Sequence, residues 1–407
     1  MAATRMGPGA RHLGVRAVVV VGAYGATSAV VLLAIVLLRR AVSPDLLRGV
    51  LSFFFIAALA AGLEPATVKA QVLRGEALGV SVAAYLGAGA LKALAVSPFL
   101  ALVWRFADPH MEVRAFLWLP LVTIIGFAAT DLRVLLDVRG RHAQAIWLKQ
   151  GALAGGLVVL AGLTAAGLPL FWAIGASTLA RLAFVGFAAV MTVEERRPKT
   201  LWPPMKALLA DPRWVDLAAA SAIAAAGGSV DRVLALRFLP AAAFGGYLLL
   251  YETFSRFWLV PYLLTPILFA RRASGQDAGP FIRGAWLATL AAGGLFVLAV
   301  AAVMLLAPDL PRRLLGTTFG PATLAFALAV VIGAFTQLRV AELQASGAAR
   351  RATLAMGLSA AIAAVLFLVF IMRLGAPGLL WAWLVKSVVE LVATLVGGRR
   401  GLRRQPV

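Results

Sequence analysis

The sequence predicts an all-α polytopic membrane protein with about twelve transmembrane helices, and three observations lead to this fold class. Of the 407 residues, 62% are hydrophobic and the mean hydropathy is +0.93, whereas soluble domains are roughly half apolar. Apolar windows of roughly 20 residues, enough to cross about 30 Å of hydrocarbon, recur along the whole chain. The period-two alternation of a membrane β-barrel is absent.

The apolar windows divide the chain into twelve expected spans, separated by short polar segments. In chain order they cover residues 15–38, 47–72, 79–104, 115–136, 144–166, 169–192, 214–237, 243–270, 281–307, 319–346, 351–372 and 377–397.

The first span follows a basic N-terminus and could be mistaken for a secretory signal. Arg5, Arg11 and Arg16 precede an apolar run over residues 17–38. That run is too long for the apolar region of a signal peptide, and many further spans follow it. We therefore expect a retained first helix.

The distribution of basic residues predicts the orientation. With the N-terminus in the cytoplasm, the cytoplasmic segments hold 23 Lys and Arg residues and the opposite side holds nine. This bias favours cytoplasmic N and C termini and an even number of spans. The net charge of +21 therefore indicates contact with anionic lipid headgroups, and we expect no nucleic-acid partner.

The longest cytoplasmic segment divides the chain into two halves of six spans. Residues 1–193 are expected to form an N-terminal six-helix bundle, 194–213 a cytoplasmic linker, and 214–407 a C-terminal six-helix bundle with a basic tail. A Leu-Arg-Val tripeptide occurs at 132–134 and again at 338–340, six spans apart. Such an offset favours a six-plus-six pseudo-repeat of the kind that transporters contain.

Isolated basic residues inside the apolar spans are the strongest functional signal. A charge at membrane depth is costly, so it usually faces a protein-lined cavity or a partner. Because these charges are mostly positive, we expect a cavity that accepts an anionic substrate. The candidate substrate-binding residues are Lys92, Arg181, Arg232, Arg256, Arg339 and Lys386.

Acidic residues stand beside four of these bases. They form the sequence-local pairs Asp231–Arg232, Glu252–Arg256, Arg339–Glu342 and Lys386–Glu390. Residues three or four apart share a helix face, which applies to the last three pairs, whereas Asp231 and Arg232 are adjacent. Each pair is either a structural ion pair or a neutralised part of a transport path. Asp231 and Glu252 are therefore candidates for ion coupling as well as for ion pairing.

Lys92 and Arg181 have no acid near them in the sequence. They could meet each other across helices, pair with Glu64, or contact substrate. Glu64 precedes Pro65, which removes a backbone hydrogen bond and favours a kink in the second span. Glu64 is accordingly either a protonation site for ion coupling or the counter-ion of a nearby base.

Catalytic and cofactor motifs are missing from the sequence. There is no cysteine, and His12, His110 and His142 lie far apart in tails or loops. The nucleotide-binding pattern G-x-x-x-x-G-K-[ST] and the hydrolase patterns G-x-S-x-G and H-E-x-x-H are also missing. We expect no enzymatic activity, no catalytic residues, no cofactor and no metal site.

Several short segments of the C-terminal half carry a recognisable pattern: 231–239 (DRVLALRFL), 245–247 (GGY), 264–271 (LTPILFAR), 314–316 with Phe319, 345–347 (ASG) and 374–379 (LGAPGL). In these segments the chain resembles the polysaccharide flippases (Wzx-like proteins) of the multidrug/oligosaccharidyl-lipid/polysaccharide exporter superfamily. The resemblance covers most of the chain in span count and spacing. The sequence departs from the family in its short length and in Leu47-Arg48-Gly49-Val50, where a tyrosine-rich entry to the second span is usual.

This resemblance implies two six-helix bundles around a central cavity, which open alternately to each side of a bacterial inner membrane. The implied cargo is an oligosaccharide linked by pyrophosphate to a polyprenyl lipid, moved to the periplasmic leaflet for surface polysaccharide such as the O-antigen of lipopolysaccharide. Polysaccharide polymerases and glycosyltransferases are the implied protein partners. Arg232, Arg256 and Arg339 fall on spans that border the family's cavity, and arginine suits phosphate oxygens.

Three alternatives stay open. A multidrug or cation antiporter of the same superfamily should have an acid-rich cavity, whereas the mid-span charges here lean basic. A membrane-embedded glycosyltransferase or polymerase usually carries catalytic acids in a large outward loop, which this sequence lacks. A scaffold that does not transport is the third, because fold does not fix function.

Overall fold

The computed structural model describes most of the chain as helices. The described residues are 8–63, 82–138, 141, 144–145, 147–192, 202–210, 222–223, 225–261, 264–265, 268, 277, 279–315, 317–345 and 349–402. Every regular element in these ranges is helical. The chain separates into two compact units, Met1–Ala222 and Ile223–Val407, which we call the N-terminal and C-terminal units.

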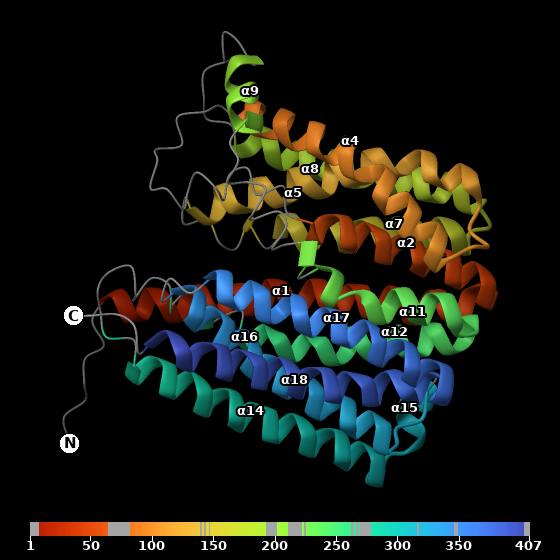
Figure 1. Cartoon of the computed structure of the whole chain (residues 1–407). Helices are drawn as coiled ribbons and strands as arrows, with labels where there is room; N and C mark the ends of the chain where they lie inside the picture. Colours follow the sequence, from red (N-terminus) through yellow and green to blue (C-terminus); the bar gives the residue numbers. More distant parts are fainter. Residues whose placement is uncertain are drawn as a thin grey trace. The chain divides into compact units, whose positions relative to one another are not determined.

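The N-terminal unit consists of long helices with short interruptions (Figure 1). Its elements are α1 (Pro8–Ala41), α2 (Pro44–Gly62), α4 (Val82–Ala107), the 3₁₀ turn η1 (Val113–Trp118), α5 (Leu119–Val138), the π-turn η2 (Trp147–Gly151), α7 (Ala152–Ala165), α8 (Leu170–Thr192) and α9 (Trp202–Ala210).

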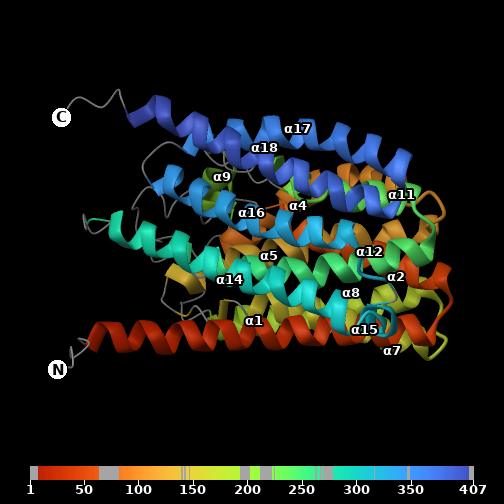
Figure 2. The same ribbon diagram turned by 90° about the horizontal axis from the view of Figure 1, so that it is seen from below.

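The C-terminal unit has the same character, and α16, α17 and α18 pack against one another along their length (Figures 1 and 2). Its elements are α11 (Val230–Phe238), α12 (Ala241–Phe254), the 3₁₀ turn η3 (Ser255–Trp258), α14 (Gly279–Leu306), α15 (Asp309–Leu315), α16 (Pro321–Ala345), α17 (Ala349–Leu374) and α18 (Ala376–Leu402).

Eight helices of the described part are long and apolar enough to cross a membrane, which fits a multi-pass membrane protein. They are Pro44–Gly62, Val82–Ala107, Val113–Leu136, Leu170–Met191, Gly279–Leu306, Pro321–Leu343, Thr353–Leu374 and Ala376–Val396. Seven of them coincide with expected spans. Pro44–Gly62 covers only the first part of the expected span 47–72, because α2 ends at Gly62 and Leu63 has an extended backbone.

Two tight contacts hold α2 inside the N-terminal unit. Trp104 Nε1 on α4 donates to Ser52 Oγ on α2 at 2.8 Å. Thr130 Oγ1 on α5 donates to the carbonyl oxygen of Ala61 at 3.1 Å. Gly126 makes this approach possible, because a Cβ there would lie 3.1 Å from the backbone nitrogen of Ala61. Small residues allow such close helix approaches in membranes.

The expected linker contains a helix that packs on the N-terminal unit. α9 places Leu208 in a buried cluster with residues of α4 and α5, and Met205 packs against the same cluster. A Cβ at Gly87 of α4 would lie 2.7 Å from Met205 Sδ, so the absence of a side chain at Gly87 accommodates the methionine. Residues 202–210 therefore belong structurally to the N-terminal unit.

The expected eighth span, 243–270, is not one continuous α-helix in its described part. α12 ends at Phe254 and the chain continues as the 3₁₀ turn η3. Thr253 Oγ1 donates to the carbonyl of Leu249 at 2.7 Å, and Ser255 Oγ to that of Glu252 at 3.3 Å. Hydroxyls that bond to preceding carbonyls compete with the helical ladder and bend helices, and Arg256 lies within this turn.

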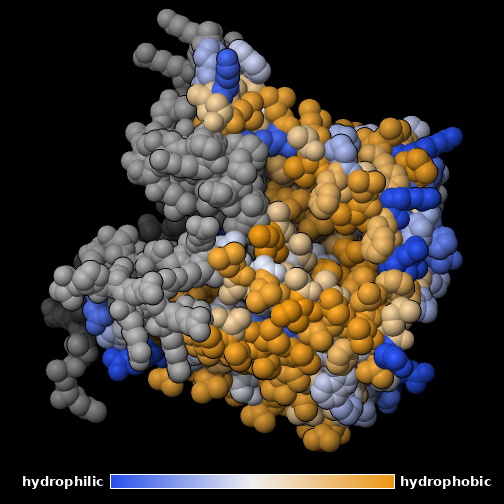
Figure 3. All heavy atoms as spheres, viewed as in Figure 1, coloured by the Kyte–Doolittle hydropathy of each residue, from blue (hydrophilic) through white to orange (hydrophobic). Residues whose placement is uncertain are grey.

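The outer faces of several helices are apolar, as a lipid environment requires. Only 17% of the most apolar window of α14 is buried, and leucines along it, such as Leu287, Leu290 and Leu298, are exposed. Figure 3 shows hydrophobic side chains covering most of the visible face and hydrophilic ones gathered towards helix ends. This is the distribution that a helix bundle in a bilayer needs.

Candidate functional site

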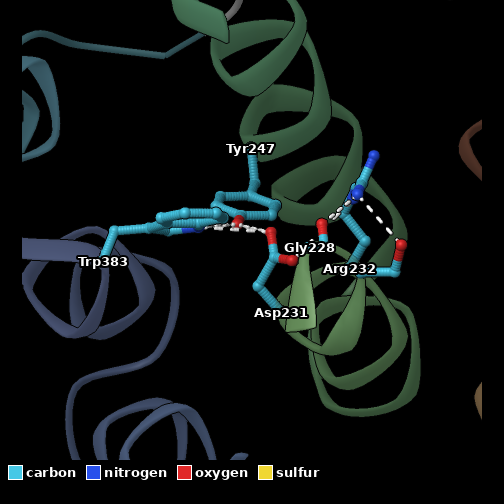
Figure 4. Close-up of polar contacts among 6 residues, drawn as sticks. Gly228, Asp231, Arg232, Tyr247 and Trp383 are labelled. Carbon is cyan, nitrogen blue, oxygen red and sulfur yellow. Dashed lines mark hydrogen bonds and ion pairs between the residues drawn. The ribbon is translucent and has the colours of Figure 1, made fainter. Parts of the chain in front are cut away.

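The C-terminal unit contains a fully buried carboxylate on α11. Asp231 is 0% exposed. Its Oδ2 accepts hydrogen bonds from Tyr247 Oη on α12 and, at 3.2 Å, from Trp383 Nε1 on α18. Trp383 Nε1 also lies 3.0 Å from Tyr247 Oη. Three helices thus meet at one carboxylate, which we call the Asp231 cluster (Figure 4).

The neighbouring base is held by different groups. Arg232 Nη2 donates to the carbonyl of Gly228 and to Ser229 Oγ at 3.2 Å. Its guanidinium carbon lies 4.4 Å from the centre of the Tyr251 ring, which is a cation–π contact. Arg232 Nε is 3.8 Å from Asp231 Oδ1. Arg232 and Asp231 therefore form an ion pair while most of the arginine's bonds go elsewhere (Figure 4).

The other predicted bases of this unit also pair with acids three or four residues away in the chain. The pairs are Arg256 Nη2–Glu252 Oε2 at 2.6 Å, Arg339 Nη1–Glu342 Oε2 at 2.5 Å and Lys386 Nζ–Glu390 Oε1 at 2.8 Å.

Indole groups support two of these pairs. Trp286 Nε1 on α14 donates to Glu342 Oε1 at 2.7 Å, and Lys386 Nζ lies 4.6 Å from the centre of the Trp383 ring. All four sequence-local pairs thus exist. An aromatic side chain contacts a member of three of them, and in the fourth Arg256 lies in the 3₁₀ turn η3.

Aromatic rings fill the space around these charges. Phe254 and Phe326 stack with their ring centres 5.5 Å apart, and Tyr251 stacks on Phe326 at 6.3 Å. Trp258 Nε1 in η3 donates to the carbonyl of Val330 on α16 at 3.0 Å. Such packing fixes the charged side chains in one arrangement.

In the N-terminal unit, Lys92 has a partner that the sequence analysis missed. Lys92 on α4 and Asp131 on α5 are both buried, at 6% and 2% exposure, and Asp131 attracts Lys92 electrostatically. Gly89 of α4 leaves room for the carboxylate, because a Cβ there would lie 3.2 Å from Asp131 Oδ2. A lone acid in the apolar run of the fourth span was the available signal.

Arg181 differs from every other predicted base that the structure describes. It lies on α8 and is 4% exposed, with its aliphatic stem over Gly156 of α7. Ser177 Oγ beside it is engaged with the carbonyl of Gly156 at 2.7 Å. Within the described residues no acid pairs with Arg181, and its Nε has no hydrogen-bond partner.

The predicted site residues that the structure describes are therefore divided between the two units. Arg232, Asp231, Arg256 and Glu252 lie on α11, α12 and η3, whereas Lys92 and Arg181 belong to the N-terminal unit. Glu64, the proposed partner of Lys92 or Arg181, lies outside the described residues. Tyr247 and Trp383 were missed because no sequence pattern connects them with Asp231.

Metal ligands do not gather in the ranges that the structure describes. No group of three His, Cys, Asp or Glu side chains there could hold an ion. The described residues provide ion pairs in the C-terminal unit and, in the N-terminal unit, the base Arg181 without an acid among them.

The fold is shared with solved membrane transporters. The chain is similar to a structure of the lipid II flippase MurJ in an inward-closed conformation, with a TM-score of 0.70 and 11% identity over 94% of this chain and 87% of that one. A mutant of the Vibrio cholerae MATE transporter VcmN gives a TM-score of 0.66 and 12% identity over 97% of both chains. The eukaryotic MATE transporter AtDTX14 gives 0.62 and 14% over 95% and 94%.

These similarities define the class of fold. The chain has the architecture of the MOP-superfamily transporters, the multidrug/oligosaccharidyl-lipid/polysaccharide exporter superfamily. The predicted all-α polytopic fold is thereby confirmed. At the level of sequence, no protein-family model and no curated protein matches the chain.

Proposed function

We propose that this protein flips a polyprenyl-pyrophosphate-linked oligosaccharide from the cytoplasmic to the periplasmic leaflet of a bacterial inner membrane, for the assembly of surface polysaccharide. Transport would proceed by alternating access and would need no covalent chemistry. The observation that carries the proposal is Arg181, a buried base for which the described residues provide no acid.

The charge balance of the buried side chains supports an anionic cargo. In the C-terminal unit the bases at 232, 256, 339 and 386 each have an acid nearby. Lys92 is compensated by Asp131. Among the described residues Arg181 then leaves an excess positive charge, which is costly at membrane depth. A phosphate group of the cargo would satisfy it, since a guanidinium binds phosphate oxygens in a bidentate manner.

Arg181 is buried in the conformation described, so cargo would reach it in another state of the transport cycle. The paired bases Arg232, Arg256, Arg339 and Lys386 would then contribute mainly to the shape of the path, and Lys92 would do the same. Glu64, Asp231 and Glu252 stay candidates for ion coupling. Anionic lipids, a polysaccharide polymerase and glycosyltransferases are the partners that we propose.

The fold similarity is compatible with this cargo. The structure with a TM-score of 0.70 belongs to a lipid II flippase, so the architecture can serve a lipid-linked substrate. The low identity of 11% limits the comparison to the fold, and the cargo assignment therefore depends on Arg181.

A multidrug or cation antiporter is the second candidate, and a specific observation favours it. Asp131 and Asp231 are buried acids, and two of the solved structures with this fold are of a multidrug resistance MATE family transporter. A cationic drug would require one of these acids to become free of its present partners.

The experiment that separates the two candidates uses proteoliposomes with both cargoes. We expect purified protein to move a fluorescent polyprenyl-pyrophosphate oligosaccharide between leaflets and not to accumulate ethidium along an imposed proton or sodium gradient. Empty liposomes and the variant Arg313→Gln, at an exposed position on α15, are the controls. Accumulation of ethidium without flipping would replace the flippase by the antiporter.

A further inference from the structure

The C-terminal unit contains a cavity whose described lining includes none of the charged residues discussed above. Its volume is about 510 Å³, and it lies where α11 connects to α12, α15 to α16, and α17 to α18. Ligand pockets usually measure about 300–1,000 Å³. By the topology that the basic residues predict, this end of the unit faces away from the cytoplasm. We call it the outer cavity.

The described residues that line the outer cavity carry no charge. They include three threonines, Thr317, Thr318 and Thr323, and two aromatic residues, Tyr247 and Trp381; alanine, glycine, proline and leucine complete the wall. This set combines hydroxyl groups with apolar surface, as a site for an uncharged polar molecule requires.

The hydroxyls have hydrogen-bonding capacity to spare. Among the described residues, Thr317 and Thr318 have no hydrogen-bond partner for their side chains. Thr323 Oγ1 accepts from the backbone nitrogen of Gly320 at 3.2 Å, which leaves its own proton available for donation. A ligand with several hydroxyls could satisfy all three, because a hydroxyl both donates and accepts.

The aromatic residues add flat apolar surface. Trp381 is 37% exposed, so its indole face is accessible. Tyr247 is held by its bond to Asp231, and the wall that it forms is therefore fixed in place. Aromatic rings with a polar tip suit ligands that are apolar on one face and polar at the edge, as a pyranose ring is.

Other ligand chemistries fit less well. Phosphate groups are usually held by Arg or Lys, and no described lining residue is basic. A lipid chain would leave the threonine hydroxyls without partners, which costs free energy in a dry site.

We propose that the outer cavity binds an uncharged saccharide portion of the transported molecule at the extracytoplasmic end of the C-terminal unit. The identity of the ligand rests on the proposed function, because the saccharide is part of that cargo. Specificity for the sugar would then lie in the C-terminal unit and phosphate recognition in the N-terminal unit.

The chain has no cysteine, so a single cysteine can report on the cavity in the otherwise unchanged protein. The variant Thr318→Cys places a thiol in the wall. The control Leu310→Cys places one at an exposed position of α15 that does not line the cavity. Both proteins, in proteoliposomes, are alkylated with a membrane-impermeant maleimide, with or without maltotriose, tri-N-acetylchitotriose or inorganic pyrophosphate.

We expect a neutral trisaccharide to slow alkylation of Thr318→Cys about threefold at a concentration of about twice its Kd, and to leave Leu310→Cys unaffected. Adding Trp381→Ala to Thr318→Cys should abolish the protection. Protection by pyrophosphate instead of the saccharides, or no protection by either saccharide, would overturn the proposal. If the protein flips the cargo but the saccharides do not protect the cysteine from alkylation, only the proposed saccharide site is refuted. If the saccharides protect the cysteine but the protein does not flip the cargo, the proposed function is refuted and the saccharide site is retained.

Discussion

The two units of this protein handle buried charge in different ways. In the C-terminal unit each of the bases at 232, 256, 339 and 386 has an acid within one helical turn or next to it in the chain. In the N-terminal unit, Lys92 depends on an acid of another helix, and Arg181 has no acid among the described residues. Among the described residues, the predicted bases of the C-terminal unit are thus neutralised locally, and those of the N-terminal unit are not.

This difference separates charges that stabilise from charges that are available for a ligand. An ion pair within one helix keeps its geometry whichever way the helix moves, so it is suited to a structural role. A buried base without a partner costs free energy, and its presence needs another explanation. A common explanation is that a residue is kept for function although it lowers stability.

The largest effect is expected from breaking the Asp231 cluster. Asp231→Ala would remove the buried acceptor of the Tyr247 hydroxyl and one of the two acceptors of the Trp383 indole, and it would leave the Arg232 guanidinium without its counter-ion. We expect a loss of about 3–5 kcal/mol in the free energy of unfolding, measured by denaturation in detergent. Asp309→Asn, at an exposed position of α15, should have no such effect. An Asp231→Ala protein as stable as Asp309→Asn would contradict the structural role of the cluster.

A smaller loss is expected where helices of the N-terminal unit approach closely. Gly126→Val would force a side chain against the backbone of Ala61, 3.1 Å from the position of a Cβ. We expect a destabilisation of about 1–3 kcal/mol. Gly155→Val on α7, where a Cβ would meet nothing within 4 Å, is the matched control. If the two variants were equally stable, α2 and α5 would not be packed as described.

The smallest effect is expected from removing one sequence-local ion pair, and it tests whether that pair is structural. In a double-mutant cycle of Glu252→Gln and Arg256→Gln, each single change leaves a partly buried charge alone, and the double change removes both. The coupling free energy should be on the order of 1 kcal/mol, and the double variant should still flip cargo. A double variant that is stable but inactive would mean that Arg256 contacts the cargo.

Most of the fold could be predicted from the sequence, because membrane spans are recognised by length and hydropathy alone. Seven of the eight described helices that are long enough to cross a membrane coincide with expected spans, and α2 covers the first part of another. The interruption at η3 escaped prediction because residues 255–258 are as compatible with a membrane helix as their neighbours. The turn depends on hydroxyl groups that bond to carbonyls.

The candidate site was only partly predictable, because the sequence shows local neighbours but not which helices pack together. Spacing along the chain identifies partners such as Arg339 and Glu342, three residues apart. It cannot identify contacts between helices, such as that of Lys92 with Asp131 or that of Asp231 with Trp383. Asp231 and Trp383 are 152 residues apart in the chain. The packing of the helices was therefore needed to show that Arg181 has no acid beside it among the described residues.

The central claim is that Arg181 is kept for the cargo at a cost in stability, and Arg181→Met tests it most directly. The account predicts that this variant is more stable than wild type by on the order of 1 kcal/mol, because a buried unpaired charge is removed, and that it no longer flips a polyprenyl-pyrophosphate oligosaccharide in proteoliposomes. Arg181→Lys, which keeps the charge without the planar fork, should retain part of the flipping rate. An Arg181→Met protein that is less stable and flips at the wild-type rate would contradict the account.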